Sequence, residues 1–301
     1  RISSSFTSIS SRAMLSTEIS SNAPEYVYPS SNGSIRFYYD GIVKVTYNLM
    51  GKGSSFNENF NVGEKITAIT PVFKGYIFDK WYEDKDLTIL WDFNDILTRD
   101  ITLYAKWNPI SYEIKFDGNG HTEGKMNHID AYYDISLLLP SNSFEKTGYN
   151  FAGWTLDKNS EVKYVNLSTV INLTTENNDE IILYAKWSPI QYTVEFNKTS
   201  GTGAMSSINM TYDRAVNLPK NSFENPGYNF MGWSDKNGGE VKYSDQQSVK
   251  NLTETDSQTL TLYAVWSVGK YTLSFNTDGG TSISPIIKEY GENLWILALF
   301  G

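Results

Sequence analysis

The sequence predicts a mostly β protein made of tandem copies of one small module. Aromatic residues form 15% of its 301 residues, with 21 tyrosines and 8 tryptophans, and they stand among many Thr, Ser, Asn and Gly residues. Such a composition is typical of β-sheets. A two-part signature, Gly148–Trp154 followed by Leu183–Trp187, recurs upstream and downstream with a period of about 80 residues. This spacing indicates a tandem repeat array.

Each copy is expected to begin with an alternating strand, followed by a Gly-rich turn and further strands. Tyr112–Phe116 alternates between apolar and polar side chains, as a strand with one wet face does. Asp117–Gly120 is a turn signal because Gly and Asn tolerate positive φ. The next strands are expected at Tyr133–Pro140 and Ile181–Trp187. The neighbouring copies repeat this order at Val43–Tyr47 and Ile101–Trp107 upstream, and at Tyr192–Phe196 and Tyr212–Pro219 downstream.

The signature is interpreted as core packing, with an exposed aromatic ligand platform as the alternative. Period two places Leu183 and Ala185 on the same strand face, and the small Ala185 predicts that the ring of Trp154 or Phe151 packs over it. Glycines flank the aromatic cluster, as a sharp bend or close backbone approach requires. The signature residues are Gly75, Tyr76, Trp81 and Trp107; Gly148, Tyr149, Phe151, Gly153, Trp154, Leu183, Ala185 and Trp187; and Gly227, Tyr228, Phe230, Gly232, Trp233, Leu262, Ala264 and Trp266.

Five segments follow from the repeat pattern. The expected segments are a flexible Ser-rich leader at 1–34, repeats at 35–107, 108–187 and 188–266, and an incomplete fourth repeat at 267–301. The fourth segment begins in phase at Tyr271 but reaches neither half of the signature. The chain has no starting Met and no signal-peptide pattern, so it is expected to be a mature form or a fragment.

The links between repeats are short and differ in stiffness. Pro109 and Pro189 stand in the first two links, and proline fixes φ there. The third link, Ser267–Lys270, has a glycine and no proline, so it is expected to flex more.

Composition excludes several classes of function. The net charge is −9 and the pI is about 4.9, which argues against nucleic acid as a partner. The absence of cysteine excludes disulfides, thiolate chemistry and Cys-based zinc sites. No apolar stretch reaches the ~18 residues of a membrane helix, so no membrane span is expected in this segment.

No catalytic, metal-binding or cofactor-binding residues are expected, and the protein is not predicted to be an enzyme. The two histidines, His121 and His128, stand only in the second repeat and lack zinc-ligand spacing. The run from Asp117 begins like a calcium loop but has Thr122 at its sixth position and His128 at its twelfth, where Gly and Glu are required. No Ser/His/Asp set or phosphate-binding loop recurs.

The ordered motifs resemble the Listeria–Bacteroides repeat, also called the internalin B-type B repeat. The resemblance covers residues 42–301. It implies tandem β-grasp-like (ubiquitin-like) modules in a beads-on-a-string array, carried by secreted or surface-anchored proteins of bacteria as stalks or adhesive segments, with no catalytic residues and no cofactor. The first repeat departs from the motif because Lys80 stands where the second has Gly153, so its bend is expected to differ.

The leading functional prediction is a non-catalytic extracellular or cell-surface protein whose repeats form a semi-rigid stalk and an adhesive surface. One alternative is a specific binding module for host or matrix glycoproteins or glycans, acting through exposed Tyr and Trp. Another is a set of accessory repeats of an enzyme whose catalytic domain lies outside this sequence. A binder should expose an aromatic or charged patch at the same place in every repeat. The oligomeric state stays open.

Overall fold

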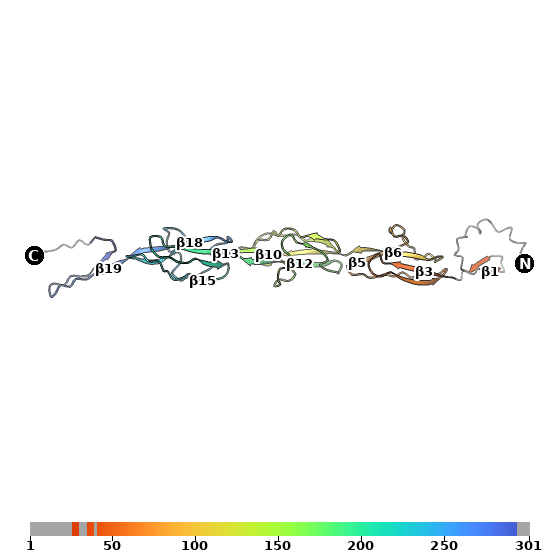
Figure 1. The fold of residues 1–301 in the computed structure, drawn as a ribbon, viewed down its shortest axis with the longest axis horizontal. Helices are drawn as coiled ribbons and strands as arrows, with labels where there is room; N and C mark the ends of the chain where they lie inside the picture. Colours follow the sequence, from red (N-terminus) through yellow and green to blue (C-terminus); the bar gives the residue numbers. More distant parts are fainter. Residues whose placement is uncertain (1–25, 30–34, 39–40, 294–301) are drawn as a thin grey trace. The chain divides into compact units, whose positions relative to one another are not determined.

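The computed structural model describes residues 26–29, 35–38 and 41–293, and in these ranges it contains strands and turns but no helix (Figure 1). The expectation of a mostly β chain is confirmed. No helix that could cross a membrane occurs among the described residues. By internal contacts the chain divides into two compact units. The first holds residues up to Lys115 with His128–Leu138 and Thr169–Ile181, and the second holds the rest.

The first repeat is one mixed four-stranded sheet with the order β4-β3-β6-β5. β3 (Ile42–Asn48) forms an antiparallel pair with β4 (Phe56–Asn61) and a parallel pair with β6 (Ile101–Pro109). β5 (Tyr76–Tyr82) lies antiparallel to β6. The parallel pair therefore joins the first and last strands of the repeat at the centre of the sheet.

The second and third repeats have the same order of strands. Their sheets run β10-β12-β7-β8 and β14-β13-β18-β16. The strands of the second are β7 (Ser111–Asp117), β8 (Ile129–Tyr132), β10 (Tyr149–Thr155) and β12 (Asp179–Pro189), and those of the third are β13 (Gln191–Asn197), β14 (Ile208–Thr211), β16 (Tyr228–Ser234) and β18 (Thr259–Val268). Each also has a two-stranded ladder, β9 (Leu137–Leu138) with β11 (Thr169–Val170) and β15 (Val216–Asn217) with β17 (Ser248–Val249).

Two further strand pairs lie outside the three four-stranded sheets. β1 (Tyr26–Pro29), inside the predicted leader, pairs with β2 (Ile35–Tyr38). The rest of that leader, residues 1–25 and 30–34, lies outside the described residues. β19 (Lys270–Leu273) pairs with β20 (Ile286–Glu289) in the predicted fourth repeat, of which residues 294–301 are likewise outside the described residues.

The core of each sheet follows from alternation along the strands. In β3 the buried side chains are Val43, Val45 and Tyr47, two residues apart, and they pack with Trp81 and Leu103. In the third repeat the equivalent cluster is built from Tyr192, Val194, Met210, Leu218, Phe223, Trp233, Val249, Leu262 and Ala264.

The prediction of a strand at Tyr133–Pro140 is wrong for most of that range. The antiparallel neighbour of β7 is β8, which ends at Tyr132, and the chain then turns at Asp134, where φ is 58°. A residue with this left-handed φ cannot continue a strand. Only Leu137–Leu138 returns to a strand. The third repeat turns in the same way at Asp213, where φ is 59°.

A β-bulge marks the strand that carries the first half of the signature. In β10 the register shifts between Phe151 and Gly153, and a Cβ on Gly153 (φ 146°) would lie 2.5 Å from Val162 Cγ1 and 2.7 Å from the Tyr164 carbonyl oxygen. The first repeat keeps the shift with Lys80 in the bulge, without positive φ. The bend itself therefore does not require glycine. Glycine is required at position 153 because residues 162–164 occupy the space of a side chain there.

We expect Gly153→Ala to lower the free energy of unfolding by about 1–3 kcal/mol, because the new Cβ meets backbone and a positive φ together. Lys80→Ala, the matched change in the first repeat, should stay within about 0.5 kcal/mol of the parent. Urea unfolding of the full chain measures both. Equal effects of the two substitutions would contradict the crowding argument.

Candidate functional site

The first tryptophan of each signature is the centre of a repeat core. Trp154 is fully buried and lies directly opposite Ala185 in the register of β10 and β12. The rings of Phe151 and Phe116 lie 4.9 and 5.0 Å from it, centroid to centroid. Trp233 has the same place in the third repeat, opposite Ala264. The small alanine leaves the room that the indole occupies.

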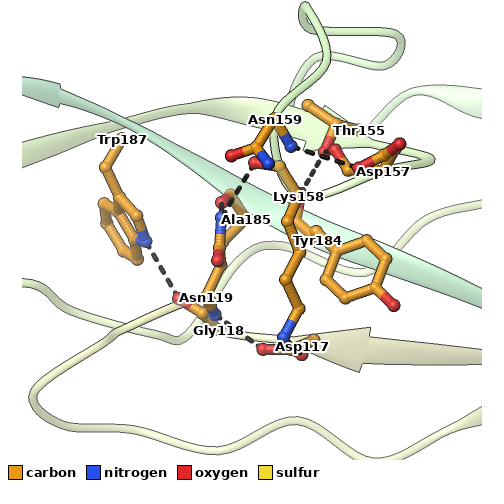
Figure 2. Close-up of polar contacts among 10 residues, drawn as sticks. All are labelled: Asp117, Gly118, Asn119, Thr155, Asp157, Lys158, Asn159, Tyr184, Ala185 and Trp187. Carbon is orange, nitrogen blue, oxygen red and sulfur yellow. Dashed lines mark hydrogen bonds and ion pairs between the residues drawn. The ribbon is translucent and has the colours of Figure 1, made fainter.

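The second tryptophan of each signature is half-buried and ties the last strand to the turn after the first. Trp187 Nε1 donates a hydrogen bond to the Gly118 carbonyl at 2.9 Å (Figure 2). The equivalent bonds run from Trp107 to Leu49 at 3.0 Å and from Trp266 to Lys198 at 3.1 Å. The indole therefore supplies the partner of a turn carbonyl as well as apolar surface.

The run that begins like a calcium loop is a turn held by its own side chains. Asn119, with φ 46°, donates its backbone N–H to Asp117 Oδ1 at 2.7 Å and its amide Nδ2 to the Ala185 carbonyl at 3.0 Å (Figure 2). Lys158 Nζ lies 3.5 Å from Asp117 Oδ2. The carboxylate is thus already used by an N–H group and an ammonium. His121 packs against Phe144, with ring centroids 4.6 Å apart.

The Gly-Tyr half of the signature lies at the joint between consecutive repeats. The ring of Tyr76 lies edge-on to Tyr133 of the next repeat at 5.7 Å, and Tyr149 lies in the same way against Tyr212 at 5.8 Å. A Cβ on Gly148, where φ is 76°, would lie 2.2 Å from the Tyr212 ring. Only glycine lets that ring approach the backbone so closely.

Two backbone hydrogen bonds complete every joint. At the first, the Ile110 N–H donates to the Gly75 carbonyl at 3.0 Å and the Tyr133 N–H donates to the Ile110 carbonyl at 3.1 Å. The second joint repeats these bonds through Ile190, at 3.0 Å each. The sequence pattern predicts the whole signature to lie in the core of one repeat and does not reveal this role at the joint. The in-phase tyrosines were the signal that could have revealed it.

Among the residues that the structure describes, a small set of possible metal ligands stands only in the second repeat. Glu113, His128 and Asp130 place one donor atom each within 4.8 Å of the others, and all three are exposed. Lys115 Nζ lies 3.8 Å from Glu113, so an ammonium already balances part of this charge. A shallow hollow of about 370 Å³ adjoins the set. The third repeat has Thr193, Ser207 and Asn209 at these positions.

A profile of the Listeria-Bacteroides repeat domain matches residues 44–106, 112–186 and 192–265, well over half of the chain. The chain belongs to this family. Three Listeria-Bacteroides repeats thus account for the three four-stranded sheets, and the resemblance drawn from the motifs is confirmed.

Relatives of the chain are longer proteins. It is 33% identical over 226 residues to a protein of Evansella cellulosilytica named "Putative membrane protein", covering 73% of this chain and 31% of that protein. A second protein of this organism, "Putative Gly-rich membrane protein", is 31% identical over 75% of this chain and 25% of its own length. Internalin H of Listeria monocytogenes is 33% identical over 35% of this chain and 21% of its own length. The chain spans less than a third of each relative.

We expect Trp154→Ala to lower the free energy of unfolding by about 3–5 kcal/mol, because it empties the centre of the second repeat. Trp187→Phe, which keeps a ring but loses the bond to Gly118, should cost only about 0.5–1.5 kcal/mol. Hydrogen exchange resolved by repeat should show the second repeat opening before the third. An unchanged melt for Trp154→Ala would contradict the core assignment.

Proposed function

We propose that this chain is a non-catalytic segment of a cell-surface or secreted protein, in which Listeria-Bacteroides repeats form a semi-rigid spacer. The observation that supports this proposal is the contact between consecutive repeats. At each one, the same Gly-Tyr end meets the same tyrosine of the following repeat through a ring pair and two backbone hydrogen bonds. Repeats that moved independently of one another would not need the same contact at every joint.

The module is proposed to be β-grasp-like. In each repeat the strand order is second, first, fourth, third, and in the first and third repeats the central pair is parallel. This order supports a ubiquitin-like path of the chain. The described residues have turns and a short ladder where a ubiquitin-like module would carry its helix, in keeping with the short or absent helix implied by the resemblance.

A surface location is supported by the relatives, two of which are named as membrane proteins and one as an internalin. The net charge of −9 supports solubility of an exposed array. Family membership and the absence of a recurring catalytic motif support the non-catalytic assignment.

Spacing is favoured over recognition by the distribution of aromatic side chains. Among the described residues, no aromatic position is exposed in all three repeats. Tyr132 is 45% exposed, but its counterpart is Thr211. The tyrosines that do recur, Tyr104, Tyr184 and Tyr263, are partly covered in every repeat and none of them is fully exposed. Adhesion is therefore proposed only as a secondary role. Its proposed partners are host or matrix glycoproteins and glycans.

Small-angle scattering of the full chain tests the spacer. With about 12 Å as the radius of gyration of one module, a chain of docked repeats should have a maximum dimension several times that of a single repeat. The same measurement at about 0.5 M salt is the control, because charge repulsion is screened there. A compact particle would refute the spacer, and strong signals on a glycan array would favour recognition.

A further inference from the structure

We propose that a tyrosine–aspartate hydrogen bond is the latch by which one repeat recognises the next. Within the described part of the chain, the first two of the three joints have this bond and the third does not. This inference rests on the proposed spacer function and names what sets the stiffness of each joint. The partner of each latch surface is the next copy of the repeat.

The latch at the second joint uses both oxygens of one carboxylate. Tyr149 Oη, from the second repeat, donates to Asp213 Oδ2 at 2.8 Å. Asn251 Nδ2, from the third repeat itself, donates to Asp213 Oδ1 at 2.8 Å, and the Asp213 N–H donates back to Asn251 Oδ1 at 2.6 Å. The asparagine fixes the left-handed turn, so the free carboxylate oxygen is held toward the preceding repeat.

The first joint has the same latch with different residues. Tyr76 Oη donates to Asp134 Oδ2 at 2.6 Å, and Asn172 makes the same two bonds to Asp134 at 2.8 and 2.6 Å. Lys52 Nζ lies 3.5 Å from the same carboxylate and 3.7 Å from the centroid of the Tyr76 ring. The arrangement therefore recurs as a unit of tyrosine, aspartate and asparagine.

The third joint keeps the packing but not the latch. The rings of Tyr228 and Tyr290 lie 6.1 Å apart, and the Gly269 N–H still donates to the Gly227 carbonyl at 2.7 Å. However, Gly291 stands where the other joints have aspartate. Gly269 replaces the isoleucines that are buried at the first two joints, Ile110 and Ile190.

The loss of the carboxylate should weaken docking. The hydrogen bond from a hydroxyl to a carboxylate is stronger than the bond from a hydroxyl to a neutral acceptor. The bonds from Asn251 and Tyr149 hold the pKa of Asp213 below its ordinary value of 3.8, with Lys250 and Lys146 acting in the same direction. Since protonation would occur only below that value, the latch stays charged at neutral and mildly acidic pH.

The absence of cysteine allows the joints to be measured one at a time. Glu161→Cys and Glu240→Cys place spin labels at equivalent exposed sites of the second and third repeats, and Ser282→Cys with Glu240→Cys spans the third joint. Double electron–electron resonance on the full chain then gives the distribution of distances across each joint. We expect a narrow distribution across the second joint and a broader one across the third.

Two substitutions exchange the properties of these joints. Asp213→Gly removes the carboxylate at a φ of 59° that glycine adopts without strain, and should raise the undocked population about threefold. Gly291→Asp adds a carboxylate where a Cβ meets nothing within 4 Å. Its φ of 85° strains any L residue, least of all Asp or Asn, and the added carboxylate should still narrow the third distribution.

Tyrosine-to-phenylalanine variants supply the matched control. Tyr149→Phe removes only the hydroxyl, so it should broaden the second distribution as Asp213→Gly does. Tyr228→Phe removes the hydroxyl at a joint that has Gly291 in place of the aspartate, and it should leave the third distribution unchanged. The second distribution should stay narrow from about pH 7 to about pH 5, since the aspartate remains ionised throughout.

Each outcome decides between the latch and simple packing. Unchanged widths in both Asp213→Gly and Tyr149→Phe would overturn the latch, and an elongated scattering particle would then leave the spacer intact. Equal effects of Tyr149→Phe and Tyr228→Phe would also overturn it. Broad distributions in the parent chain at both joints, with a compact scattering particle, would reject the spacer itself.

Discussion

The tandem array depends on a close approach between a tyrosine ring and a backbone that has no Cβ. At Gly75, Gly148 and Gly227 the ring of the next repeat occupies the space of a side chain, and a Cβ would lie 2.2–2.5 Å from it. This contact fixes where the following strand can begin, because the same glycine carbonyl accepts the N–H of the linking residue. Any larger residue there would separate the ring from the backbone and break both bonds.

One strand serves two purposes in each repeat. β10 begins at Tyr149, in the joint, and ends beyond Trp154, in the core, with the bulge at Gly153 between them. The bulge turns the tryptophan inward while the tyrosine stays at the end of the module. This explains why the Gly-Tyr and Gly-Trp pairs occur in a single motif, and it couples docking of a repeat to the stability of its own core.

The repeats differ from one another where the shared design leaves freedom. The first keeps the bulge with Lys80 and without a positive φ. The second alone carries His121 and His128, one of them packed on Phe144. At the third joint a glycine replaces the aspartate seen at the first two. Variation of this kind, on a constant sheet, is in keeping with the proposal that the stiffness of the array is set at each joint.

The period, the alternation along β3, β7 and β13, and the order of motifs were enough to predict the β class, the number of complete repeats and the family. Those features are local in the sequence or recur at a fixed period, so a single sequence is enough to detect them. The joint was decided only by the tertiary structure. Tyr149 and Asp213 are far apart in the sequence, and each looks like part of its own repeat. The turn at Asp134 was likewise mistaken for a strand, because alternation cannot reveal a left-handed residue whose conformation is held by an asparagine 38 residues away.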